Sequence, residues 1–407
     1  MKQLLAYCLS IILCVSFTGC MENYLDLYPE DKITSASFPE NESDIKLLLN
    51  GVYAQLREKE VYNQGLFGFG ITDGATPNAF NWGTDEVFNK LGAGRLSSSD
   101  GGVVTYRWKR CYEIISRANY LLACMDLVDL SEEAKAKYSG ETHFLRGLAY
   151  SVLAETYGGV PIILTDISTE EARSLKRASL EETWQQALDD YEVAITNLGV
   201  DAPEPGRATK GAALGMKMRA YLYQGKYKEV LSCVEQIDAL KKYGLFHSYE
   251  GLFDPANENN KEVLFDIQYI EGENSQGSYI DQYCGTGTGS WTRGSRYVPT
   301  DDLVAAYETI DGSPVDPENP YENRDPRLGF TAVLPGSYFL GYRFPNYLYP
   351  GGAFNHAGNR LKHLSTRKYR IQDESKLPPS GQSYINDIIL RYADVLLSKA
   401  EAIFETD

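Results

Sequence analysis

The strongest constraint on the fold of this chain is the stretch at residues 141–161, which reads ETHFLRGLAYSVLAETYGGVP. Its apolar residues recur at the spacing of one helix face over three turns: Phe144, Leu145, Leu148, Ala149, Val152 and Leu153. Gly158 and Gly159 allow the left-handed conformation that ends a helix, and Pro161 prevents the helix from restarting. The pattern therefore predicts a buried amphipathic helix that ends at the glycine pair.

Similar apolar stripes predict further helices before residue 241. They cover residues 42–57, with Asn41 as the N-cap, residues 106–125, a helix that starts after Ser131, and one that opens with a capping box from Ser179 to Glu182. Residues 209–240 predict two helices around Gly225, and their segment AYLYQGKYKEVLSCVEQI resembles a tetratricopeptide helical hairpin. We therefore expect a mainly α protein in which tetratricopeptide-like hairpins form a scaffold.

Two tracts, residues 65–102 and residues 271–297, lose helical periodicity and are rich in glycine. Just before the second tract, residues 262–270 alternate apolar and polar side chains, which predicts a short strand. After the second tract the sequence predicts a short helix at residues 301–309, and residues 338–349 are densely aromatic. We expect a loop-rich lobe containing a few short strands, with regions 20–240 and 241–407 forming one interlocked globular unit.

Residues 1–19 form a predicted secretion signal, in which Lys2 supplies the positive end and residues 4–17 the apolar core. That core is too short for a comfortable membrane span. It leads into Thr18-Gly19-Cys20, which resembles a bacterial lipobox, so we expect Cys20 to be lipidated and to anchor the protein in a membrane. An ordinary signal peptide cleaved near Gly19 is the alternative interpretation.

Charge and cysteine content exclude several classes of function. The formal charge is −17, which argues against a nucleic-acid-binding surface because phosphate contacts need clustered Lys and Arg. The cysteines that follow Cys20 form no CxxC motif, and no His lies at metal-ligand spacing from them, so no redox site, metal or cofactor is expected. Cys111 and Cys233 fall on apolar helix faces and are predicted to be buried free thiols. Tyrosine is frequent, with 30 residues, and suits surfaces that bind amphipathic ligands.

Several motifs together resemble the SusD/RagB family, the outer-membrane glycan-binding lipoproteins of Bacteroidetes. FLRGLAYSVLAETYGGVPI resembles its central segment, and in family order the chain also carries LDLYP at residues 25–29, RAN at 117–119, NRDPRL at 323–328 and RYADVLLSKAEA at 391–402. The resemblance implies a surface-exposed, lipid-anchored outer-membrane protein. Such a protein would capture oligosaccharide and deliver it to a TonB-dependent, SusC-like transporter.

The resemblance also implies that another helical pair should follow the RYADVLL motif. This chain stops at Asp407, within the helix that the RYADVLLSKAEA motif predicts, so we expect region 241–407 to be truncated. Within that helix, Arg391 and Asp394 lie three residues apart and are expected to pair as part of the scaffold.

The candidate ligand-binding residues lie in the two glycine-rich tracts. A sugar site needs flat aromatic rings flanked by polar side chains, and exposed loops commonly carry such sites. In the first tract Trp82 lies among Asp73, Asn78 and Asn81; in the second, Trp291 lies near Arg293 and Tyr297. The alternative is that either Trp anchors its loop in a small core. Trp108 and Trp184 fall on helix faces and are assigned to the core.

Other patterns were weighed for chemistry and assigned structural roles. Residues 285–290 (GTGTGS) lack the GK[ST] ending of a phosphate-binding loop. Arg324, Asp325 and Arg327 could bind an acidic sugar, but a buried structural ion pair before Leu328 is the favoured interpretation. No catalytic residue is proposed and we expect no enzyme. The alternatives are capture of a peptide with the same transporter, a tetratricopeptide-type adaptor that binds protein, and a surface glycoside hydrolase.

Overall fold

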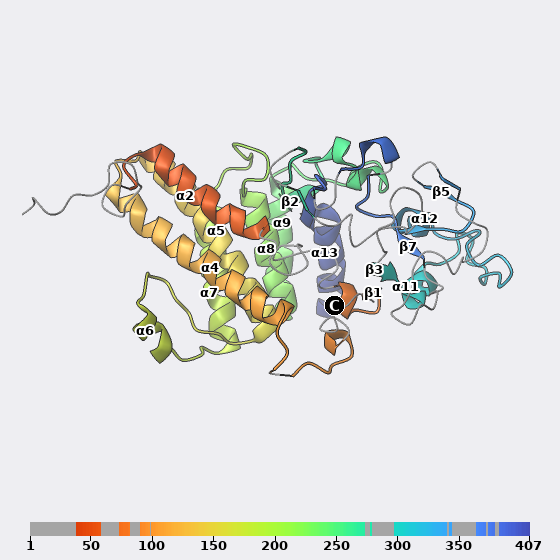
Figure 1. Ribbon diagram of the computed structural model, residues 1–407, viewed down its shortest axis with the longest axis horizontal. Helices are drawn as coiled ribbons and strands as arrows, with labels where there is room; N and C mark the ends of the chain where they lie inside the picture. The colour runs from red at the N-terminus through yellow and green to blue at the C-terminus, as the bar shows by residue number, and fades with distance from the viewer. Residues whose placement is uncertain are drawn as a thin grey trace, which may run out of the picture.

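A computed structural model describes residues 38–57, 73–81, 90–97, 99–272, 277–278, 297–339, 342–343, 364–371, 373–378 and 382–407. Long helices lie side by side at one end of the molecule and a lobe of loops and short strands lies at the other (Figure 1). The predicted leader, Cys20, Trp82, Trp291 and Arg293 fall outside the described residues. No helix within the described ranges is both long enough and apolar enough to cross a membrane.

The helical scaffold contains α2 (Glu42–Ala54), α4 (Val103–Cys124), α5 (Glu132–Tyr157), α6 (Thr169–Ser174), α7 (Leu180–Asn197), α8 (Lys210–Tyr223), α9 (Tyr227–Ala239) and α13 (Tyr392–Thr406). The predicted N-caps are confirmed: the side chains of Asn41, Ser131 and Ser179 each accept a hydrogen bond from a first-turn backbone N–H, and Ser179 forms a capping box with Glu182. The prediction of a mainly α fold with hairpins of tetratricopeptide type is also confirmed.

Helix α5 is the centre of this scaffold, as its apolar stripe predicts. Phe144, Leu145, Leu148 and Ala149 are fully buried, and α5 packs against α7, α4 and α2. Gly147 permits the close approach of α7, since a Cβ on it would lie 3.0 Å from the Cβ of Asp190. Tight packing of this kind is the main source of helix stability, because isolated helices are marginal in water.

A buried polar network connects three helices and a following segment. Arg146 of α5 donates to Asp190 of α7 from Nε (3.1 Å to Oδ2) and Nη2 (2.7 Å to Oδ1), and its Nη1 donates to Oδ1 of Asn119 on α4 at 2.8 Å. Asn119 in turn donates to the carbonyl oxygens of Ile163 and Thr165. The network therefore fixes α4, α5, α7 and the chain after the glycine pair relative to one another.

Gly158 and Gly159 end α5 for different reasons. Gly158 is the C-cap and has φ +74°, the left-handed region that favours glycine. Gly159 is constrained by space, because a Cβ there would lie only 2.0 Å from the carbonyl oxygen of Ala178. The chain then turns away, and Ala178 donates a backbone hydrogen bond to Val160. The predicted helix end is confirmed.

The RYADVLLSKAEA segment forms the expected helix, but a strand that the sequence analysis did not predict comes directly before it. Residues Asp387–Arg391 form strand β8, which pairs antiparallel with β2 (Val263–Ile267), and α13 begins only at Tyr392. Arg391 and Asp394 do not pair with each other: Arg391 lies 2.5 Å from Glu262, and Asp394 lies 2.5 Å from Arg219 on α8. The extended conformation at Arg391 directs its side chain toward β2, which explains the difference.

The loop-rich lobe contains the short strands that the sequence predicts. Besides β2–β8, the described pairs are β1 (Ala79–Asn81) with β3 (Tyr297–Pro299), β4 (Ala332–Val333) with β7 (Ser365–Thr366), and β5 (Tyr338–Phe339) with β6 (Tyr342–Arg343). The short helices α11 (Asp301–Ala306) and α12 (Arg327–Thr331) lie between β3 and β4 in the chain. Helix α13 lies between this lobe and the main helical group (Figure 1). The division into regions 20–240 and 241–407 stays a prediction.

The RDPR segment is structural, but not through the predicted buried ion pair. Arg324 is buried and donates to backbone carbonyls, with Nε 3.1 Å from the oxygen of Tyr307 and Nη1 2.7 Å from that of Pro320. Asp325 pairs instead with Arg327, whose side chain is exposed. The left-handed conformation of Asn323 (φ +55°) precedes Arg324 in this turn, so local backbone geometry determines which charge is buried.

The cysteine prediction is confirmed for the thiols that the structure describes. Cys111, Cys124 and Cys233 are free and buried. Burial raises the pKa of Cys111 to about 12 and that of Cys233 to about 11, so both behave as apolar side chains. Trp184 is buried and Trp108 packs against the main core, as expected for helix-face residues.

Candidate functional site

The two tracts predicted to bind ligand meet in one place. Strands β1 and β3 pair with Ala79 opposite Pro299, Phe80 opposite Val298 and Asn81 opposite Tyr297. The pair is extended by Thr300, whose backbone N–H donates to the carbonyl of Asn78 at 3.1 Å and whose hydroxyl donates to that of Pro77, 223 residues earlier. Asn81 and Tyr297 are thus brought together, although Asn81 and Tyr297 are described only in their backbone.

Three side chains at this pair are open to solvent. Asp73, in a short 3₁₀ turn, and Asn78 are exposed, and the ring of Phe80 is 41% exposed, whereas Val298 opposite it is buried. Phe80 is a candidate aromatic platform that our sequence analysis missed, although it stands two positions before Trp82. An exposed ring beside exposed carboxylate and amide groups suits a ligand that has apolar faces and hydroxyl groups.

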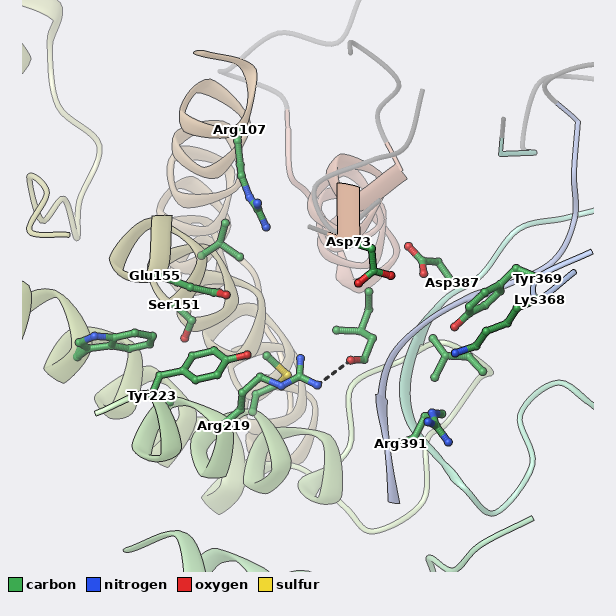
Figure 2. A pocket seen from close by; sticks show the side chains of 16 residues that line it. Asp73, Arg107, Ser151, Glu155, Arg219, Tyr223, Lys368, Tyr369, Asp387 and Arg391 are labelled. Atoms are coloured by element: carbon green, nitrogen blue, oxygen red, sulfur yellow. Dashed lines mark hydrogen bonds between the residues drawn. The ribbon is translucent and has the colours of Figure 1, made fainter. Parts of the chain in front are cut away.

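Asp73 also lines a cavity of about 350 Å³ between the helical scaffold and the loop-rich lobe (Figure 2). From the helices come Arg107, Ser151, Glu155, Trp184, Arg219 and Tyr223; from the other side come Asp73, Lys368, Tyr369, Asp387 and Arg391. The volume lies in the range of small-molecule sites. Asp73 therefore connects the β1–β3 pair to a polar cavity that the sequence did not predict.

Two of the cationic groups in this cavity are neutralised by carboxylates. Arg219 pairs with Asp394 and also donates to the carbonyl of Ile389 at 3.0 Å. Arg391 pairs with Glu262, whose other carboxylate oxygen accepts from the backbone N–H of Phe246 at 2.7 Å. These pairs position the cavity wall on β8 against α8 and β2.

Burial shifts the pKa values of Lys368 and Asp387 in the direction that favours the uncharged form of each side chain. The Nζ of Lys368 lies 4.4 Å from the centre of the Phe253 ring, and burial lowers the pKa of this amine. Burial raises the pKa of Asp387 to about 7, and the nearby carboxylates of Asp266 and Asp73 add to the rise. Near neutral pH, Asp387 can therefore both donate and accept a hydrogen bond.

The cavity offers binding chemistry. It presents the exposed ring of Tyr223, hydrogen-bond acceptors on Asp73 and Glu155, and donors on its basic side chains. Among the described residues, no group of three or more His, Cys, Asp or Glu side chains could hold a metal ion. The sequence gives little indication of this cavity, because Arg107 and Tyr223 lie on predicted helices and cannot be told from ordinary surface residues there.

Comparison with known proteins identifies the family. Residues 23–222 match a family model described as starch-binding and associating with the outer membrane, and residues 261–407 match the model of the SusD family. The chain belongs to the SusD/RagB family. The family is carbohydrate-binding and associated with the outer membrane, and the family membership expected from the sequence motifs is confirmed.

The relatives are distant in sequence but close in fold. The chain is 26% identical over 321 residues to the SusD-like protein P25 of Formosa agariphila, covering 73% of this chain and 58% of P25. A SusD-like protein of Bacteroides ovatus is 24% identical over 420 aligned positions, covering 95% of this chain and 69% of that protein. This chain thus spans little more than half the length of P25.

Solved structures confirm the architecture. A SusD-like carbohydrate-binding protein of Bacteroides fragilis superposes with a TM-score of 0.79 at 26% identity, over 90% of this chain and 74% of that one. A second SusD-like protein of the same species gives a TM-score of 0.78 at 26% identity, over 93% and 78%. A laminarin-binding SusD-like protein shares the fold alone, with a TM-score of 0.63 at 20% identity over 89% and 80%.

Proposed function

We propose that this protein captures an oligosaccharide without covalent chemistry, at the β1–β3 pair and the adjoining cavity. The observation that carries the proposal is the pairing of residues 79–81 with residues 297–299, which brings together the two tracts that hold Trp82 and Trp291. The exposed groups of Asp73, Asn78 and Phe80 surround that pair. The carbohydrate-binding character of the family supports the assignment.

The ligand would then pass to a membrane transporter. We propose a TonB-dependent, SusC-like protein as the partner, with lipidated Cys20 tethering this chain to the outer membrane at the cell surface. Moderate affinity is expected because a captured ligand must also be released for import. Deleting the tether by Cys20→Ala should release the protein from membranes without changing glycan affinity, which fractionation and a binding assay would measure.

Three other functions make different predictions. Capture of a peptide with the same partner predicts binding of oligopeptides in place of sugars. If the protein is a tetratricopeptide-type adaptor, replacing Phe80, Trp82 or Trp291 by Ala should leave its binding to a protein partner unchanged. A glycoside hydrolase predicts new reducing ends when protein meets glycan, and its two carboxylates would need a defined separation.

The test is isothermal titration of the purified, lipid-free protein against a panel of oligosaccharides. We expect Trp82→Ala, Trp291→Ala or Phe80→Ala each to weaken binding of the panel member that binds, by about tenfold, or about 1.4 kcal/mol. Phe404→Ala is the matched control, because that ring is also exposed (81%) but lies on α13. Unchanged binding in all three variants would refute the proposed site.

A further inference from the structure

Arg107 differs from the other arginines of the cavity. It lies on α4, and its side chain extends into the cavity from one end (Figure 2). Its Nε is buried and has no hydrogen-bond acceptor, and within the described ranges no carboxylate pairs with its guanidinium. Arg219 and Arg391, by contrast, each have a carboxylate at 2.5 Å.

The end of the Arg107 guanidinium extends into the cavity without a carboxylate partner among the described residues, and a ligand that supplies an anionic group would form a charge-assisted hydrogen bond there. The guanidinium presents parallel N–H groups that match the two oxygens of a carboxylate or two oxygens of a sulfate ester. Arg107 therefore has the chemistry of an anion anchor in a cavity where the other two guanidinium groups are already occupied.

The carboxylates of the cavity interact with groups other than Arg107. Burial raises the pKa of Tyr223, and the charge of Glu155 adds to that rise, which places Glu155 beside Tyr223 and Arg219. Asp73 and Asp387 face each other on the opposite wall, near Lys368 (Figure 2). The charge of Arg107 is felt by Cys111, where it opposes the rise in pKa that burial causes. Among the described residues, none of these carboxylates forms an ion pair with Arg107.

The remaining cavity groups suit the rest of a sugar. Tyr223 is 53% exposed and offers a ring for C–H faces, while Asp73 and Glu155 can accept hydrogen bonds from hydroxyl groups. A neutral sugar would use these groups and leave Arg107 without an acceptor. A sugar with an anionic substituent would use both.

We propose that this cavity selects an acidic oligosaccharide, whose carboxylate or sulfate group binds Arg107. This inference rests on the proposed glycan capture and specifies the class of glycan. It predicts that binding weakens with salt, because an ion pair between ligand and protein is screened, whereas binding of a neutral sugar is insensitive to salt. The anionic substituent, and not the sugar ring, provides the selectivity.

The experiment compares three probes by titration calorimetry: trigalacturonic acid, a sulfated galacto-oligosaccharide and a neutral galactotriose. We expect at least one acidic probe to bind at least about tenfold more tightly than the neutral one. Arg107→Gln should lower the affinity for the acidic probes toward that for the neutral probe and remove the salt dependence. Arg173→Gln on α6 makes the same change of charge at an exposed position and should alter nothing.

Arg107→Lys keeps the charge without the paired N–H geometry, and we expect it to retain part of the preference. This variant, with circular dichroism to verify folding, keeps the test decisive if Arg107→Gln is unstable. Equal affinity for acidic and neutral probes, or an unchanged preference in both Arg107 variants, would overturn the inference alone. Binding of none of the probes or of the wider glycan panel would overturn the proposed function as well.

Discussion

The network around Arg146 gives the most exacting test of how the scaffold is held together. Replacing Arg146 by Met keeps most of the side-chain volume and removes the guanidinium. Asp190, only 1% exposed, then loses three N–H···O contacts from Arg146, at 3.2, 3.1 and 2.7 Å. Asn119 loses a fourth, at 2.8 Å. An unpaired carboxylate remains in the core between α5 and α7.

The magnitude follows from opposing contributions. Hydrogen bonds to charged groups contribute about 1.5–3 kcal/mol each, which would suggest a very large loss if simply summed. The cost of removing both ions from water offsets most of that sum, and the loss of one partner from a buried pair typically costs about 3–5 kcal/mol. We therefore expect Arg146→Met to reduce the free energy of unfolding by about 4 kcal/mol. The double variant Arg146→Met/Asp190→Leu should recover more than half of it, because no buried charge is left.

The assay is urea denaturation followed by circular dichroism, with Arg173→Met as a control. Arg173 is exposed on α6, so its replacement should change stability by no more than about 0.5 kcal/mol. A loss below about 1 kcal/mol for Arg146→Met would refute the view that the network holds α5 and α7 together. So would a double variant as unstable as the single one.

The remaining predictions concern the helix end, pH and the thiols. Gly159→Ala should lower the free energy of unfolding by more than about 2 kcal/mol, because the new Cβ would meet the carbonyl oxygen of Ala178. Gly158→Ala should lower it by only about 1–2 kcal/mol, because its Cβ meets open space and only the left-handed backbone conformation is strained. The same urea denaturation assay compares the two variants. The folded-state pKa of Asp387 is raised from 3.8 to about 7, so its contribution to stability is complete below about pH 4 and is lost as the pH rises through 7. Asp387→Asn should thus raise the urea midpoint relative to wild type at pH 8 but not at pH 4, and an equal change at both would contradict this. Maleimide labelling at pH 7.5, read by mass spectrometry, should leave Cys111 and Cys233 unmodified until the protein unfolds.

Local signals were sufficient for the helices of the scaffold. Caps such as Ser131 and Ser179 and the spacing of apolar residues on α5 depend on a few neighbouring residues, so the sequence predicts them directly. The boundary before Tyr392 was beyond such reasoning. The run Ile388–Leu390 is apolar in either conformation, and only its pairing with β2, more than a hundred residues earlier, makes it a strand.

The candidate site could be predicted only in part for a related reason. Composition located the two aromatic, glycine-rich tracts, but nothing in either tract indicates that Asn81 would stand opposite Tyr297. The cavity combines several distant parts of the chain, among them those that carry Arg107, Tyr223 and Lys368. Sequence patterns also cannot tell a surface arginine from one whose Nε becomes buried without an acceptor.

The family motifs and the cavity residues overlap only in part. Asn119, Arg146 and Gly159 belong to motifs that identify the family, and each is fixed by the packing or hydrogen bonds of the scaffold. Arg107, Tyr223 and Lys368 line the cavity and lie outside the motifs. Glu155 and Arg391 belong both to motifs and to the cavity, and Arg391 is held by Glu262. The motifs therefore account for the framework and part of the cavity wall, whereas Arg107, Tyr223 and Lys368 are not part of any motif. It follows that Arg107, rather than any motif residue, is where the ligand preference of this protein should be sought first.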